Sequence, residues 1–87
     1  MTIEQIDNFL KKNEYDRNPV KVSFKTRNSF TGIFLKTNDY EDLKGKNFWR
    51  IIGEANVKKY MSSKDTTLAR IFNGTEITKL TTVETFG

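Results

Sequence analysis

Few residues of this chain could carry chemistry, because the sequence contains neither histidine nor cysteine. Zinc sites built on thiolate or imidazole are therefore excluded, as are Cys–His and Ser–His nucleophilic pairs. The densest group of carboxylates is Asp39, Glu41 and Asp42, and carboxylates are ligands of magnesium and calcium. Their spacing is not that of a calcium-binding loop, so we favour a solvated loop. We find no catalytic constellation and predict a protein that is not an enzyme and uses no metal or cofactor.

Two aromatic positions are candidates for stacking on a nucleic-acid base. Tyr40 lies in a polar stretch, where burial is harder to arrange, so base stacking and simple packing stand about even. Trp49 is followed by Arg50, which suits a stacking platform with a basic neighbour. A small domain needs large core residues, however, and we favour packing of Trp49 under an N-terminal helix.

The chain is basic, with 15 Lys and Arg against 11 Asp and Glu, a net charge of +4. Residues 44–59 carry this whole excess, since five basic residues oppose only Glu54 there. A basic stretch interleaved with aromatic residues is typical of polyanion binding. The same stretch could be a solvated, lysine-rich sheet edge that prevents aggregation, and charge alone favours this second interpretation.

Residues 20–35 carry the strongest structural signal. Val20, Val22 and Phe24 alternate with polar residues, which is the pattern of a half-buried strand. A polar break at residues 26–29 precedes a second apolar run, so the pattern predicts an antiparallel hairpin. Gly32 interrupts the second strand and indicates a bulge, a sharp bend or a close backbone approach.

The N-terminal residues predict a short helix. Thr2 and Gln5 have the spacing of a capping box. Ile3, Ile6 and Leu10 recur on one helical face. A helix this short is marginal alone, so we expect it to lie against the sheet.

The rest of the chain predicts short strands separated by turn residues. Its apolar runs are residues 48–52, 57–61 (an extension or a separate strand), 66–72 and 76–80. Asn73 and Gly74 form the clearest tight-turn pair in the chain. Residues 48–52 are apolar on both faces, so a helix or a partner must cover at least one side.

Together these elements predict a single mostly β domain over residues 1–87. It consists of an N-terminal helix, a five-stranded, strongly bent antiparallel barrel and a frayed tail, at residues 1–15, 19–80 and 81–87. SH3-like, OB and Sm-like small barrels all fit this description. The predicted core is Val20, Val22, Phe24, Phe34, Ile51, Ile71 and Ile77.

Two stretches resemble the motifs of the Sm-like family. Residues 20–43 are similar to its first motif, with an alternating strand, a strand with a central glycine and an aspartate-rich loop. Residues 68–80 resemble its second motif, and the opening helix that leads into Pro19 is similar to Hfq-like members. The resemblance implies a homo-oligomeric ring of six or seven subunits that binds single-stranded RNA near its pore.

Carried over position by position, the resemblance implies an RNA site at Tyr40, Asp42 and Asn73, with Lys44 and Lys46 beside it. Tyr40 falls where the family stacks a residue on a base. Asp42 replaces the usual asparagine and Asn73 the usual arginine, so the resemblance implies little preference among bases.

The resemblance also implies that subunits join through their fourth and fifth strands. The predicted interface residues are Leu68, Arg70, Phe72, Ile77 and Leu80. We expect a cytoplasmic protein, because no apolar run reaches membrane-spanning length and no signal-peptide pattern opens the chain. A protein-interaction or assembly module with the same barrel is the alternative, and a carboxylate-based metal enzyme is a weaker one.

Overall fold

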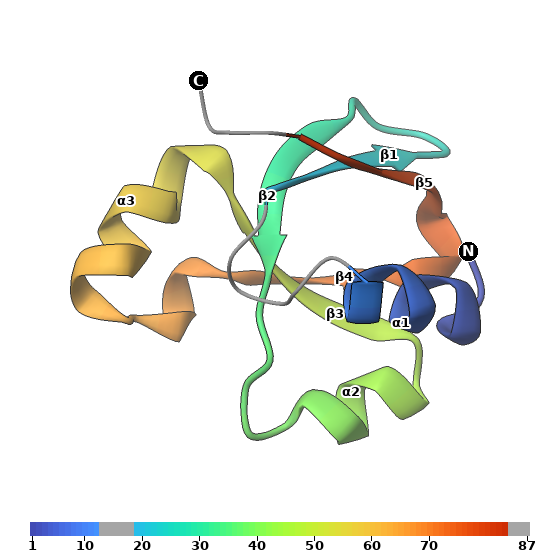
Figure 1. The fold of residues 1–87 in the computed structure, drawn as a ribbon, viewed down its shortest axis with the longest axis horizontal. Coiled ribbons are helices and arrows are strands. Elements are labelled where there is room, and N and C mark those ends of the chain that lie inside the picture. The colour runs from blue at the N-terminus through green and yellow to red at the C-terminus, as the bar shows by residue number, and fades with distance from the viewer. Residues whose placement is uncertain (13–18, 84–87) are drawn as a thin grey trace.

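The computed structural model describes residues 1–12 and 19–83, and the arrangement of their elements is shown in Figure 1. The helices are α1 (Ile3–Lys12), α2 (Tyr40–Gly45) and α3 (Glu54–Ser63), with short 3-10 turns η1 (Thr66–Leu68) and η2 (Gly74–Glu76). The strands are β1 (Val20–Phe24), β2 (Phe30–Phe34), β3 (Phe48–Gly53), β4 (Arg70–Asn73) and β5 (Ile77–Thr82). The predicted tail therefore begins too early, since Thr81 and Thr82 belong to β5.

The strands form one antiparallel sheet in the order β4-β3-β2-β1-β5. The predicted N-terminal helix and five-stranded antiparallel sheet are thus confirmed. In the described part of the chain β4 and β5 form the two edges and do not pair with each other, so the sheet is not closed.

Gly32 makes the close backbone approach that the sequence indicates. It pairs with Gly53 across β2 and β3. A Cβ atom at Gly32 would overlap the carbonyl oxygen of Ile52. Any side chain here would therefore push β3 away from β2.

Helix α1 begins with the predicted capping box. The Thr2 backbone N–H donates to Gln5 Oε1 (2.9 Å), and the Gln5 N–H donates to Thr2 Oγ1 (3.2 Å). Ile6 and Leu10 then pack into the core with Trp49. The predicted extension of this helix to residue 15 falls outside the described residues.

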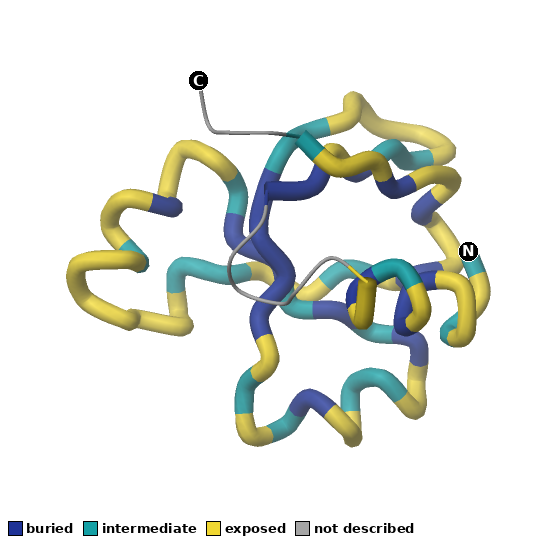
Figure 2. Tube along the Cα trace, in the orientation of Figure 1, coloured by how far each residue is buried: buried dark blue, intermediate teal, exposed yellow. Residues whose placement is uncertain are grey.

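The two faces of β2 and β3 pack into separate hydrophobic clusters. Ile51 points to the cluster beneath α1, and its neighbour Ile52 points to a second cluster with Ile33, Leu35 and Val57. Helix α3 covers this second face, and the β2–β3 region is the buried centre of the trace in Figure 2. We expected a helix or a partner to cover at least one side of residues 48–52, and this is confirmed. Residues of α1 pack on one face and residues of α3 pack on the other.

Residues 57–61 are helical, so the predicted strand there is wrong. Val57 and Tyr60 lie one turn apart and both pack on the second cluster, which gives the segment a helical apolar face. The helix ends at Ser63, and the next residue, Lys64, adopts a left-handed conformation (φ 57°) and donates its N–H to the Tyr60 carbonyl.

Two core predictions need correction, at Ile71 on the edge strand β4 and at Phe24 on β1. Ile71 is 49% exposed, because it faces the same side as its cross-strand partner Arg50 while α3 covers only β2 and β3. Phe24 is half-buried. Asn73 and Gly74 turn the chain as predicted but lead into η2, because β4 and β5 lie at opposite edges of the sheet.

Candidate nucleic-acid interface

Three phenylalanines from distant strands meet on one side of the sheet. Phe24 of β1 and Phe30 of β2 stack with ring centroids 5.5 Å apart and planes 12° apart. Phe72 of β4 lies 5.5 Å from Phe24 and 5.3 Å from Phe30. All three are half-buried, so the fold leaves part of this aromatic group accessible. We call these three residues the open aromatic group.

Arg27 lies over the open aromatic group. It comes from the turn between β1 and β2, and its guanidinium carbon is 5.5 Å from the centroids of both Phe24 and Phe72. This is a cation–π arrangement, which holds a positive charge against ring faces. Arg27 is exposed as a residue, so the charge stays available to a ligand.

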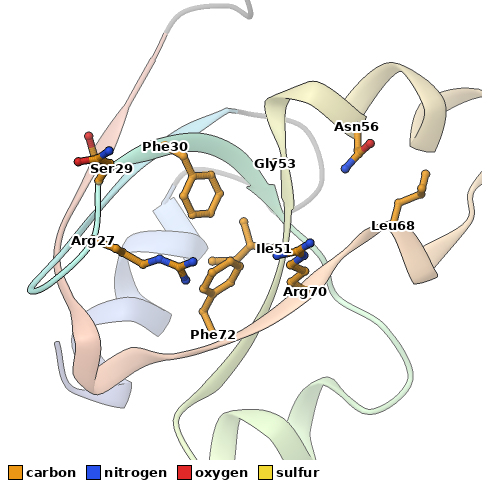
Figure 3. Close-up of a pocket in the computed structure, with 10 residues that line it drawn as sticks. Arg27, Ser29, Phe30, Ile51, Gly53, Asn56, Leu68, Arg70 and Phe72 are labelled. Atoms are coloured by element: carbon orange, nitrogen blue, oxygen red, sulfur yellow. The ribbon is translucent and has the colours of Figure 1, made fainter.

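A pocket of about 520 Å³ opens beside this group. Phe30, Phe72 and Arg27 line one part, and Arg70, Asn56 and Leu68 line another. Figure 3 shows Arg27 reaching toward Phe72, with Arg70 and Asn56 on the far side of Ile51. None of the described residues that line this pocket carries a carboxylate, so it combines ring surface with two arginine side chains.

The polar residues of the pocket can form hydrogen bonds with a planar ligand. Asn28 and Ser29 come from the β1–β2 turn, and Asn56 comes from the first turn of α3. Amide side chains both donate and accept hydrogen bonds, as base edges do. The N-cap of α3 is Gly53, which has no side chain to cap the first turn, and the acidic Glu54 lies in that turn.

Tyr40 is buried, at 7% exposure. Its side chain therefore packs inside the domain and is not presented for stacking on a base. Its ring lies 6.0 Å from Trp49 in an edge-on arrangement, and its hydroxyl donates to Asp7 Oδ1 (3.2 Å). Trp49 is buried beneath α1 as expected, and its Nε1–H donates to Asn47 Oδ1 (2.7 Å).

The other residues of the site implied by the family resemblance are dispersed. Lys44 forms an ion pair with Asp7 (3.2 Å), whereas Lys46 and Asp42 are exposed on and after α2. Asn73 Oδ1 accepts from the Thr75 N–H (2.9 Å) at the start of η2. Of this set, Asn73 alone lies next to the open aromatic group, beside Phe72.

The acidic cluster is divided between an ion pair and a solvated helix. Asp39 accepts hydrogen bonds from Thr37 and from Arg50 (2.6 Å), while Glu41 and Asp42 are exposed on α2. The Thr37 hydrogen bond, with a further contribution from Arg50, holds the pKa of Asp39 below its usual value. Within residues 1–12 and 19–83, no group of metal-ligating side chains is close enough to hold an ion.

The basic stretch of residues 44–59 is not one surface patch. Lys44 and Arg50 are paired with Asp7 and Asp39, and Lys58 and Lys59 are exposed on α3.

The sequence interpretation missed Arg27 and Phe30, which were assigned to a turn and a strand. The available signal was the spacing Phe24–Arg27–Phe30, which brings aromatic and basic residues to the same hairpin end.

Comparisons with protein-family models, with curated proteins and with solved structures each found no match to this chain. In the described residues, no helix has both the length and the apolar character needed to cross a membrane.

Proposed function

We propose that this protein binds single-stranded RNA through the open aromatic group and the arginines beside it. One observation carries the proposal: half-buried phenylalanines and two arginines line one pocket whose described lining residues include no carboxylate. Single-stranded nucleic acids are bound by this combination, because bases stack on aromatic faces and cations attract the phosphates. In place of Tyr40, which is buried, Phe30 and Phe72 provide the stacking surface.

The proposal also includes an Sm-like small barrel that self-assembles. Contacts between Phe24 of β1 and Phe72 of β4 support strong curvature of the sheet. The edges β4 and β5 carry backbone groups that a second copy could pair with. Arg70 and Phe72 lie on the edge strand β4, and Leu68 ends η1 just before it. Ile77 and Leu80 are buried in their own subunit, so β5 would contribute its backbone.

Light scattering tests the assembly directly. We expect a homo-oligomer, because one copy leaves both sheet edges open. A monomer at high protein concentration would contradict self-assembly and leave RNA binding to be tested on the single chain.

The second candidate is a protein-interaction module, and the exposure of Ile71 favours it. An apolar side chain 49% exposed on an edge strand suits pairing with another polypeptide. The charge of the pocket distinguishes the two candidates, since a phosphate chain needs Arg27 and Arg70 and a paired strand needs only the backbone of β4.

Fluorescence anisotropy with labelled six-nucleotide U and A RNAs at low salt tests the RNA proposal. The variant Arg27→Ala/Arg70→Ala should weaken binding about tenfold or more, since a hydrogen bond to a charged group contributes about 1.5–3 kcal/mol. The matched control is Lys12→Ala/Lys21→Ala, which removes the same charge from exposed positions away from the pocket. Equal losses in both variants would show that binding follows net charge only. No binding by the folded protein would move the function to the interaction module.

A further inference from the structure

A second hollow adjoins the pocket on the other side of Arg27. It has a volume of about 490 Å³ and is lined by Phe24, Ile71, Asn73 and Glu76, among others. Arg27 and Phe72 line both hollows. The two hollows are therefore neighbouring parts of one surface, separated by the guanidinium that lies on the rings.

Each hollow has a phenylalanine of its own. Phe30 lines the first and Phe24 lines the second, while Phe72 belongs to both. The Arg27 guanidinium carbon lies 5.5 Å from the ring centroids of Phe24 and Phe72. One positive charge therefore lies against a ring that lines the second hollow and against the ring that lines both.

We infer that each copy of the chain binds a dinucleotide step, with one base in each hollow and the bridging phosphate at Arg27. This inference rests on the proposed function and specifies its ligand. A phosphodiester carries one negative charge between two bases, and the surface carries one arginine between two ring surfaces. A single nucleotide would fill only half of it.

The charges at the two ends of this surface differ. Arg70 lines only the first hollow, and Glu76 lines only the second. A phosphate beyond the dinucleotide is attracted by Arg70 and repelled by Glu76. The second hollow therefore accepts a base but disfavours an additional phosphate.

The first test compares uridine monophosphate with the dinucleotide UpU, both titrated by NMR. Both ligands have one phosphate, and the monophosphate carries the larger charge, so tighter binding of UpU reports the second base. We expect UpU to bind about tenfold more tightly, the effect of one stacked base. Equal affinities, with the six-nucleotide RNA still bound, would overturn the dinucleotide site and leave the proposed function standing. Failure of the six-nucleotide RNA to bind would instead overturn the proposed function.

Two variants at different positions test where the second base binds, so the test does not fail if one of them does not fold. Phe24→Leu keeps an apolar side chain but removes the ring, and it should reduce the affinity for UpU to about that of the monophosphate. Glu76→Gln should increase the affinity for the six-nucleotide RNA several-fold more than Glu41→Gln does. Glu41 is exposed on α2, and its substitution changes the net charge by the same amount. Equal effects of the two glutamine variants would contradict a phosphate path past Glu76. Unchanged discrimination between UpU and the monophosphate in folded Phe24→Leu would contradict the second base position.

Discussion

The protein contains two aromatic groups that differ in how the fold treats them. Phe34, Tyr40 and Trp49 form a buried group, in which the Tyr40 and Trp49 polar atoms are hydrogen-bonded to Asp7 and Asn47. Phe24, Phe30 and Phe72 form the open aromatic group, which is half-buried and has Arg27 over its rings.

The two aromatic groups differ in what covers them, and we expect this difference to decide which group contributes to stability and which to binding. The buried group lies in the cluster that α1 completes, so its surface is removed from water on folding. The open group faces a pocket and keeps surface that a ligand can cover. Phe34, Tyr40 and Trp49 should therefore dominate stability, and the open group should dominate binding.

The largest expected effect comes from truncating the buried group. Trp49→Ala should lower the free energy of unfolding by about 3–5 kcal/mol, since it leaves a cavity and removes the hydrogen-bond donor to Asn47 Oδ1. Phe30→Ala should cost less than half as much, because Phe30 is only half-buried. Urea denaturation measures both. Equal losses would mean that the two groups do not differ in structural role.

Arg27 should affect binding far more than stability. The exposed cation–π contact contributes about 0.5–1 kcal/mol, so Arg27→Ala should melt close to the wild type. If Arg27 neutralises a phosphate, its loss should reduce the slope of log affinity against log salt by about 0.7. Anisotropy titrations at several salt concentrations measure the slope, with Lys12→Ala as the charge control. An unchanged slope would remove Arg27 from the site.

The smallest effect concerns pH. The pKa of Asp39 is lowered in the folded protein, chiefly by the Thr37 hydrogen bond and then by Arg50. Its contribution to stability is present above the unfolded pKa of about 3.8 and is lost as pH falls through the lower folded value. Asp39→Asn should therefore flatten the decline of stability in this acidic window. The same pH dependence in both proteins would show that the contact contributes little.

Local sequence patterns correctly predicted the elements that depend on neighbouring residues in the sequence. The alternation of Val20, Val22 and Phe24 defined the first strand, and the Thr2–Gln5 spacing defined the start of α1. Gly32 indicated a close approach without identifying Ile52 as the neighbour.

The errors arise where burial depends on segments distant in sequence. Tyr40 sits in a polar stretch, yet its hydroxyl donates a hydrogen bond to Asp7, 33 residues away, so the ring can be buried. Residues 57–61 have an apolar content that fits either a strand or a helix, and their packing on β2 and β3 is what distinguishes them. The open aromatic group depends on sheet curvature that brings Phe72 to Phe24 and Phe30, which no local pattern encodes.

The most direct test of the central claim is RNA binding by Phe72→Leu and Tyr40→Phe, measured side by side by anisotropy. Phe72→Leu removes the ring that both hollows share and should weaken binding by about 1–3 kcal/mol. Tyr40→Phe keeps the ring and removes the hydroxyl that donates to Asp7, so it should lower stability by about 1 kcal/mol and leave RNA affinity unchanged. The reverse pattern, with affinity lost in Tyr40→Phe and kept in Phe72→Leu, would contradict the assignment of RNA binding to the open aromatic group.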